Sequence, residues 1–122
     1  MILPDTSVWV DHFRNRIADM EALLHAEEIA IHAFVVGELA LGMLPSRQRV
    51  LADLQDLPFA ITAQDYEVLQ LIHTRSLYGL GLGYIDVHLM ASVLLTPGTK
   101  LWTRDKRLRA AAKQLGLDAG LA

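Results

Sequence analysis

Two carboxylates stand alone in strongly apolar stretches of the chain. Glu38 is the only charged residue between positions 29 and 44, and Asp86 is the only one between positions 76 and 99. A buried carboxylate without a partner is costly, so each of these side chains needs a partner or a cation. We therefore take both as candidates for a functional site.

Two aspartates follow short apolar runs that are typical of strands. Asp5 comes directly after Met1–Pro4, and Asp105 comes just after Lys100–Thr103. The carboxyl ends of parallel strands lie on one edge of a sheet, where sites assemble. Helices that carry the two isolated acids near their starts would add carboxylates to the same edge.

Four converging carboxylates repel one another unless a divalent metal ion is bound between them. The chain has no cysteine, and its histidines show no metal-ligand spacing such as His-x-x-x-His. Oxygen ligands alone are typical of Mg²⁺ or Mn²⁺ sites. We therefore expect Mg²⁺ (or Mn²⁺) as the cofactor, bound as one or two ions.

Each acid also has a simpler interpretation. Asp5 and Asp105 occupy positions at which an aspartate caps the N-terminus of a helix. Asp86 could complement the positive N-terminal end of its own helix. Glu38 could pair with an arginine from elsewhere in the chain. The four acids together indicate a site more strongly than any one of them does.

Short apolar runs alternate with helical patterns along the chain. Strands are predicted over Met1–Pro4, Ile29–Ile31, Phe59–Ile61 and Lys100–Thr103. Helices are predicted from about Val8 onward, over Asp19–Ala26, over Phe34–Leu44, over Arg47–Leu57 with Ser46 as its cap, from a Thr62–Asp65 capping box to about Leu77, and over Ile85–Leu95 and Lys106–Leu115. This alternation indicates an α/β fold with a mostly parallel sheet, formed as a single domain over residues 1–122.

Composition excludes several classes of protein. The chain has 122 residues, of which 52% are hydrophobic and 20% are charged, so a disordered tail or a fibre is excluded. The lack of cysteine excludes a disulfide scaffold, a zinc–thiolate site and a thiol nucleophile. The apolar stretch around Asp86 is interpreted as a buried helix and not as a membrane span. The first residues show no export signal, so we expect a cytoplasmic protein.

Four short motifs carry a resemblance to a known family. They are Leu3-Pro4-Asp5-Thr6-Ser7, Val36-Gly37-Glu38-Leu39 followed by Gly42, Tyr84-Ile85-Asp86 followed by Met90-Ala91, and Leu101-Trp102-Thr103-Arg104-Asp105-Lys106-Arg107-Leu108. In their order, spacing and total length the chain resembles the PIN-domain ribonucleases, in particular the VapC-type toxins of bacterial toxin–antitoxin pairs.

Two residues depart from the family pattern. Pro4 removes a hydrogen-bond donor from what should be an inner strand, so that strand is expected to be short or bulged. His88 stands where the family often has small or aliphatic residues. Neither departure affects the four acids.

The resemblance implies a PIN-like three-layer α/β domain, with a mostly parallel central sheet flanked by helices. It implies a metal-dependent endoribonuclease that cleaves structured RNA of the tRNA or rRNA class and acts as the toxin of a toxin–antitoxin pair. Carried onto this chain, the catalytic and metal-binding acids are Asp5, Glu38, Asp86 and Asp105. The residues that orient these carboxylates or water would be Thr6, Ser7 and Thr103.

The resemblance also implies partners. The expected ones are a separately encoded antitoxin protein, whose C-terminal segment wraps the toxin, and the RNA substrate. We further hypothesise a homodimer.

Basic residues gather near the C-terminus although the net charge is −3. Residues 98–122 hold six basic and two acidic side chains, whereas the first 97 residues hold five and twelve. This cluster beside Asp105 is a candidate surface for RNA phosphates, although a solvated helix face is the alternative for any one residue. The candidate RNA-binding residues are Arg104, Lys106, Arg107 and Arg109.

Three rival interpretations compete with the nuclease. A catalytically silent PIN-like module would bind RNA or protein without cleaving, and the presence of all four acids disfavours it. A phospho-acceptor receiver domain would need adjacent acidic residues after the first strand, but this chain has a single acid there, Asp5. A haloacid-dehalogenase phosphatase would need Asp-x-Asp, and the chain has Asp5-Thr6-Ser7.

Overall fold

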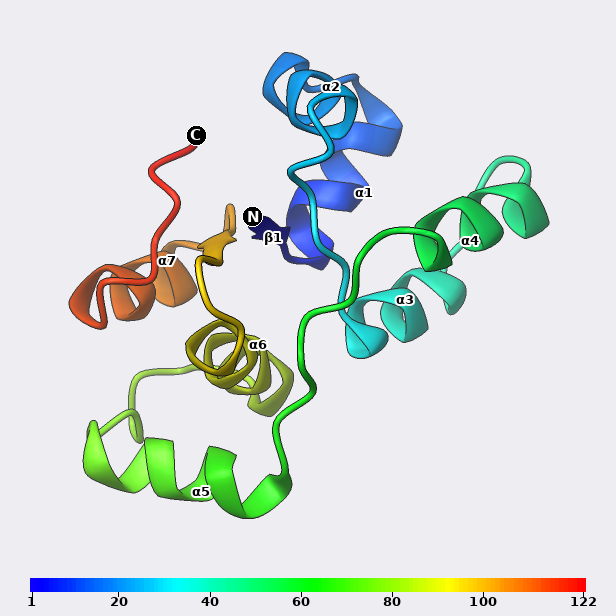
Figure 1. Cartoon of the computed structure of the whole chain (residues 1–122). Coiled ribbons are helices and arrows are strands. Elements are labelled where there is room, and N and C mark those ends of the chain that lie inside the picture. The colour runs from blue at the N-terminus through cyan, green and yellow to red at the C-terminus, as the bar shows by residue number, and fades with distance from the viewer.

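A computed structural model describes the whole chain, residues 1–122. It has two strands and seven helices (Figure 1). They are β1 (Ile2–Pro4), α1 (Thr6–Arg14), α2 (Ala18–His25), α3 (Ala33–Ala40), α4 (Arg47–Gln55), α5 (Asp65–Thr74), α6 (Tyr84–Leu95), β2 (Lys100–Trp102) and α7 (Lys106–Gln114).

The two strands form the centre of a parallel sheet. In β1 and β2, Ile2 pairs with Lys100, Leu3 with Leu101 and Pro4 with Trp102. Single parallel bridges extend the sheet on both sides and join Ile2 to Ile29, Ile31 to Phe59, and Leu101 to Asp118. The extended segments therefore lie in the order Phe59, Ile29–Ile31, β1, β2, Asp118. This confirms the α/β class with a mostly parallel central sheet.

The outer segments of the sheet are less regular than predicted. The segments Ile29–Ile31 and Phe59–Ile61 form single bridges and not full strands. Backbone hydrogen bonds still hold them, because Ile31 N donates to the Pro58 carbonyl and Ala60 N donates to the Ile31 carbonyl, each at 2.8 Å. β1 is only three residues long, as expected from Pro4 at its end.

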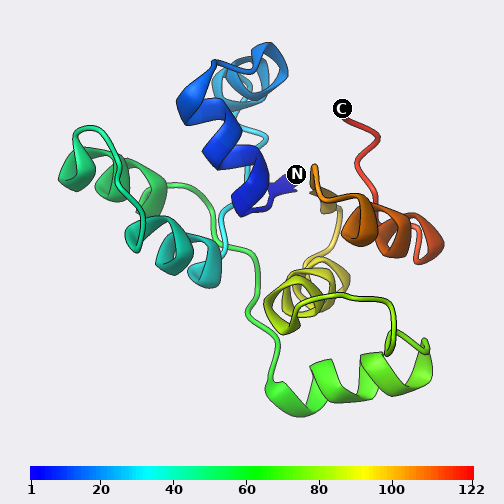
Figure 2. The same cartoon turned by 180° about the vertical axis from the view of Figure 1, so that it is seen from behind.

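Helices cover both faces of the sheet. Figure 1 shows α1 and α2 on one side of the strand pair and α6 and α7 on the other, and Figure 2 shows the same arrangement from behind. α5 packs on α6, and α4 packs beside α3. Leu3, Leu101 and Trp102 are buried between the helical layers. These layers confirm the predicted three-layer arrangement.

The helix over Phe34–Leu44 is shorter than predicted. α3 begins at Ala33 and ends at Ala40, and Leu41 and Met43 beyond it are 90% and 100% exposed. These two side chains are not covered by the rest of the protein, so they provide no packing energy for extending the helix past Ala40. Ser46 does stand at the N-cap of α4, but its side chain makes no capping hydrogen bond and its φ of 49° is left-handed.

The predicted capping box of the next helix is displaced by two residues. α5 begins at Asp65, so Gln64 is the N-cap, and Thr62 is not. Glu67 accepts a hydrogen bond from Gln64 N at 2.9 Å. The helix ends at Thr74 and not near Leu77.

None of the helices combines the length and the apolar character that crossing a membrane requires.

Leu3→Ala is expected to lower the free energy of unfolding by about 2–5 kcal/mol, because it leaves a cavity at the centre of the sheet. Urea unfolding followed by circular dichroism measures this loss. Leu41→Ala is the matched control, since Leu41 is 90% exposed, and should stay within about 0.5 kcal/mol of wild type. Equal losses in the two variants would contradict the core position of Leu3.

Candidate active site

The segments that follow β1 and β2 meet around Asp5. This carboxylate is buried at the N-cap of α1, where its Oδ1 accepts a hydrogen bond from Val8 N at 3.2 Å. Ser7 Oγ donates to Oδ1, and Thr103 Oγ1 donates to Oδ2. Both oxygens of Asp5 are therefore held, one of them by a residue 98 positions away in the sequence.

The same two hydroxyl groups reach the segment that carries Asp105. Thr103 Oγ1 accepts a hydrogen bond from Asp105 N, and Ser7 Oγ accepts one from Arg104 N, each at 3.1 Å. Asp105 is the N-cap of α7, and its Oδ1 accepts from Leu108 N at 2.9 Å. The capping interpretation is thus correct for this acid, but capping engages only one of its oxygens.

Glu38 lies on α3 and faces α1. Thr6 Oγ1 donates to Glu38 Oε1 at 2.7 Å. The Glu38 side chain is exposed, although the residues around it in the sequence are apolar. It borders a cavity of about 480 Å³ that is formed between α1 and the segment joining α3 to α4.

Asp86 lies half-buried in the first turn of α6, and its Oδ2 accepts a hydrogen bond from Gly83 N at 3.3 Å. Burial raises the pKa of Asp86, and the negative charges of Asp5, Asp105 and Glu38 raise it further, against the lowering effect of the Gly83 bond. The structure therefore brings the other three acids within electrostatic reach of Asp86.

Asp5 is also shifted toward its neutral form. Burial raises the pKa of Asp5, although the hydrogen bonds from Ser7, Thr103 and Val8 act in the opposite direction. Desolvation outweighs the bonds because the carboxylate is almost fully enclosed.

No basic side chain is paired with these four acids. The ion pairs of the chain join Arg16 to Glu21, His88 to Asp65 and Arg104 to Asp11. No three His, Asp or Glu side chains lie close enough together to enclose a metal ion. The set of donors still suits a hard divalent cation, because it consists of carboxylate oxygens whose charge no arginine or lysine compensates.

The four basic candidates differ in their surroundings. Arg104 pairs with Asp11 at 3.1 Å, and Arg109 donates to the Thr103 carbonyl at 2.7 Å. Lys106 and Arg107 are exposed on the first turn of α7, and neither forms an ion pair.

A polar network beside the acids was missed by sequence reasoning. Asp65 at the start of α5 accepts hydrogen bonds from Tyr84 and His88 on α6, the helix that carries Asp86. His88 is the one member that the sequence analysis singles out, because of the family resemblance. Asp65 resembles an ordinary capping residue in the sequence, so only the packing of α5 on α6 reveals this contact.

Asp86→Asn is expected to stabilise the metal-free protein at neutral pH, because it removes a charge that burial and three carboxylates disfavour. The raised pKa of Asp86 lies above its usual value of 3.8, so the folded chain keeps this proton to a higher pH than the unfolded chain does. The free energy of unfolding therefore falls as pH rises through that window. Urea unfolding in EDTA at about pH 4 and pH 7 measures this difference. The free energy of unfolding of Asp86→Asn should exceed that of wild type at pH 7, and by a smaller margin at pH 4. An Asp86→Asn protein less stable than wild type at pH 7 would contradict this.

Comparison with known proteins identifies the family. The family model for the PIN domain matches residues 2–114. Two relatives from Mycobacterium tuberculosis, of strains CDC 1551 / Oshkosh and ATCC 25618 / H37Rv, are both named Ribonuclease VapC32. Each is 47% identical to this chain over 118 residues, which cover 96% of the chain and 94% of the relative. The chain therefore belongs to the PIN-domain family and is of the VapC type.

Proposed function

We propose that the chain is a metal-dependent endoribonuclease that acts as the toxin of a toxin–antitoxin pair. The observation that carries this proposal is the group of four acids formed by Asp86 and its three acidic neighbours, with which no basic side chain is paired. The PIN-domain membership and the name of the VapC32 relatives support the same activity.

The proposed cofactor is Mg²⁺ or Mn²⁺. A bound Mg²⁺ ion usually keeps several waters and contacts only one or two carboxylates, which suits acids that do not enclose an ion by themselves. Asp5 and Asp86 are the first candidates to hold it, and Glu38 and Asp105 complete the acidic set. When bound, the ion would lower the pKa of a water molecule and neutralise the phosphate at the cleavage point.

The neighbouring residues of the chain hold these acids in position. Ser7 and Thr103 donate to Asp5, and Thr6 donates to Glu38. Hydrogen-bonded neighbours of this kind fix the orientation of carboxylates that would otherwise rotate. We therefore assign Thr6, Ser7 and Thr103 to the orientation of the acids.

The proposed substrate is structured RNA of the tRNA or rRNA class. The exposed side chains of Lys106 and Arg107 follow Asp105 directly and could contact phosphates on either side of the cleavage point. Arg104 and Arg109 extend the same surface, although both already make contacts within the protein.

The proposed protein partner is an antitoxin. The cavity of about 480 Å³ beside Glu38 is lined mainly by apolar side chains, including Phe13 and the fully exposed Met43. An apolar segment of a partner could fill it, and an arginine of that segment could pair with Glu38. A homodimer stays a prediction.

Asp5→Asn and Asp86→Asn are each expected to lower the rate of RNA cleavage by about 10²–10³-fold, because each removes a charge from the acidic site. The partner-free protein is incubated with total tRNA and rRNA in Mg²⁺, Mn²⁺ or EDTA, and discrete fragments should form only with the metal ions.

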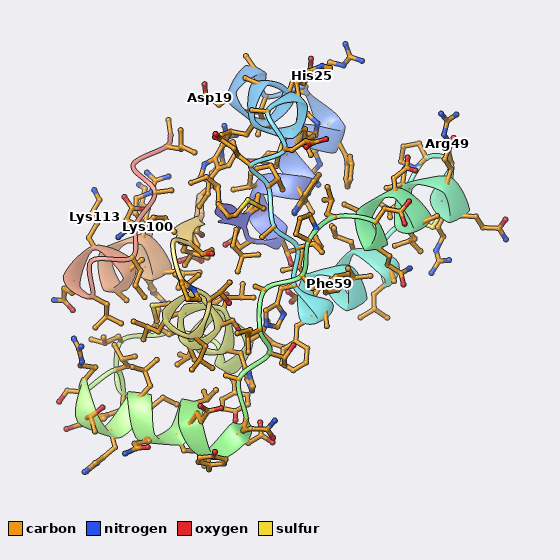
Figure 3. All side chains as sticks on the ribbon, in the orientation of Figure 1. Asp19, His25, Arg49, Phe59, Lys100 and Lys113 are labelled. Atoms are coloured by element: carbon orange, nitrogen blue, oxygen red, sulfur yellow. The ribbon has the colours of Figure 1, made fainter.

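The control for this experiment is Asp19→Asn, which removes an exposed carboxylate on α2, far from α6 and α7 (Figure 3), and should leave cleavage unchanged. Fragments that persist in both site variants would contradict the proposal. RNA binding without cleavage by the folded wild-type protein would favour the catalytically silent module.

A variant that carries both Lys106→Ala and Arg107→Ala is expected to bind RNA about tenfold more weakly and to reduce the salt dependence of binding by about two phosphate contacts. Filter binding at several salt concentrations measures both quantities. Lys113→Ala, at the far end of α7 (Figure 3), removes one positive charge that is not among the four candidate RNA-binding residues, and this control should lower the salt dependence by less than the double variant does. A salt dependence equal to that of wild type would contradict the assignment.

A further inference from the structure

Asp65 joins α5 to the first turns of α6 through a single oxygen. Tyr84 Oη donates to Asp65 Oδ1 at 2.8 Å, and His88 Nε2 lies 3.1 Å from the same atom. An ionised carboxylate can only accept hydrogen bonds, so His88 donates through Nε2. The hydrogen bond from Tyr84 lowers the pKa of Asp65, and the bond from His88 lowers it further, which agrees with an ionised acceptor.

His88 makes no other hydrogen bond to compensate for its burial. Its side chain is only 2% exposed, and its Nδ1 atom has no hydrogen-bond partner. The rings of Phe34 and Tyr84 pack edge-on against the imidazole, with centroids 4.8 and 4.9 Å away. The contact with Asp65 is thus the only polar interaction that fixes the orientation of this ring.

Tyr84 and His88 lie one helical turn apart on α6, and Asp86 lies between them. The only side-chain cap at the start of α6 comes from Asp86 itself, whose carboxylate accepts a hydrogen bond from Gly83 N. The N-cap of the helix is Gly83, which offers no capping side chain, and the loop before it contains Gly79 and Gly81 with positive φ. The only hydrogen bond that Asp86 accepts here, from Gly83 N, is long at 3.3 Å.

We propose that Asp65 is a positioning residue, which holds Tyr84 and His88 and thereby fixes the turn of α6 that presents Asp86 to the other three acids. We call these three residues the Asp65 clamp. The inference rests on the proposed function for its catalytic consequence, whereas the effect of the clamp on the order of α6 is independent of any activity. It also gives the buried imidazole of His88 its one hydrogen-bond partner.

The test compares Asp65→Ala with Asp65→Asn. Asparagine keeps a carbonyl oxygen that can accept from both donors, whereas alanine removes the acceptor. In the metal-free protein, the amides of Val87 and His88 should exchange hydrogen about tenfold faster in Asp65→Ala than in wild type, and Asp65→Asn should restore slow exchange. With RNA and Mn²⁺, kcat should fall about tenfold in Asp65→Ala while KM for RNA stays unchanged.

One further variant controls for a general loss of stability, and a second one tests a single donor of the clamp. Glu67→Ala removes another acid from the first turn of α5. Glu67 accepts a hydrogen bond from Gln64 N and makes none to α6. This variant should therefore leave hydrogen exchange in α6 and kcat unchanged. Tyr84→Phe removes one donor of the clamp, keeps the ring, and should give a smaller effect than Asp65→Ala in the same direction.

Equal effects of Asp65→Ala and Glu67→Ala would overturn the proposal, and so would slow α6 exchange in both Asp65→Ala and Tyr84→Phe. If the wild-type protein cleaves no RNA, the proposed function fails, and hydrogen exchange alone then decides whether the clamp exists.

Discussion

Like charges at the carboxyl ends of the central strands repel one another, and much of the surrounding structure serves to hold them there. Asp5 is the most strongly held, because both of its oxygens accept hydrogen bonds. Asp86 is the least compensated, because it has one long bond to Gly83 and three carboxylates within electrostatic reach. A site that concentrates negative charge without a basic partner favours the binding of a cation, and the proposed chemistry follows from that preference.

Two hydroxyl groups connect the carboxylate of Asp5 to the backbone that follows β2. Ser7 and Thr103 each donate to Asp5 and each accept from the backbone after β2. The residues are far apart in the sequence, and pairing of β1 with β2 brings them together. In our proposal, Asp65 likewise holds the first turns of α6 in position through its hydrogen bonds with Tyr84 and His88. The acids are thus positioned by short polar contacts and not by a long and regular sheet.

Sequence reasoning predicted the order of the elements because that order follows from local patterns, and it singled out the four acids as a candidate site in the same way. Asp5 and Asp105 come after apolar runs and before helices, and both are N-caps in the structure. It failed where tertiary packing decides the outcome. α3 ends at Ala40, and the side chains of Leu41 and Met43 beyond it remain exposed, which only the tertiary structure reveals. The segment near Asp118 forms an edge of the sheet through backbone hydrogen bonds to Leu101. No side-chain pattern in the sequence predicts these bonds. The contact of Asp65 with α6 likewise needs the packing of two helices.

The central claim is that the four acids form one cation site. Crystals grown with Mn²⁺ and measured near the manganese absorption edge would test it most directly, because anomalous scattering locates the ion independently of any activity. We predict an anomalous peak in contact with the carboxylates of Asp5 and Asp86. A well-ordered crystal with saturating Mn²⁺ and no peak at these acids, or with peaks only elsewhere on the surface, would contradict the account.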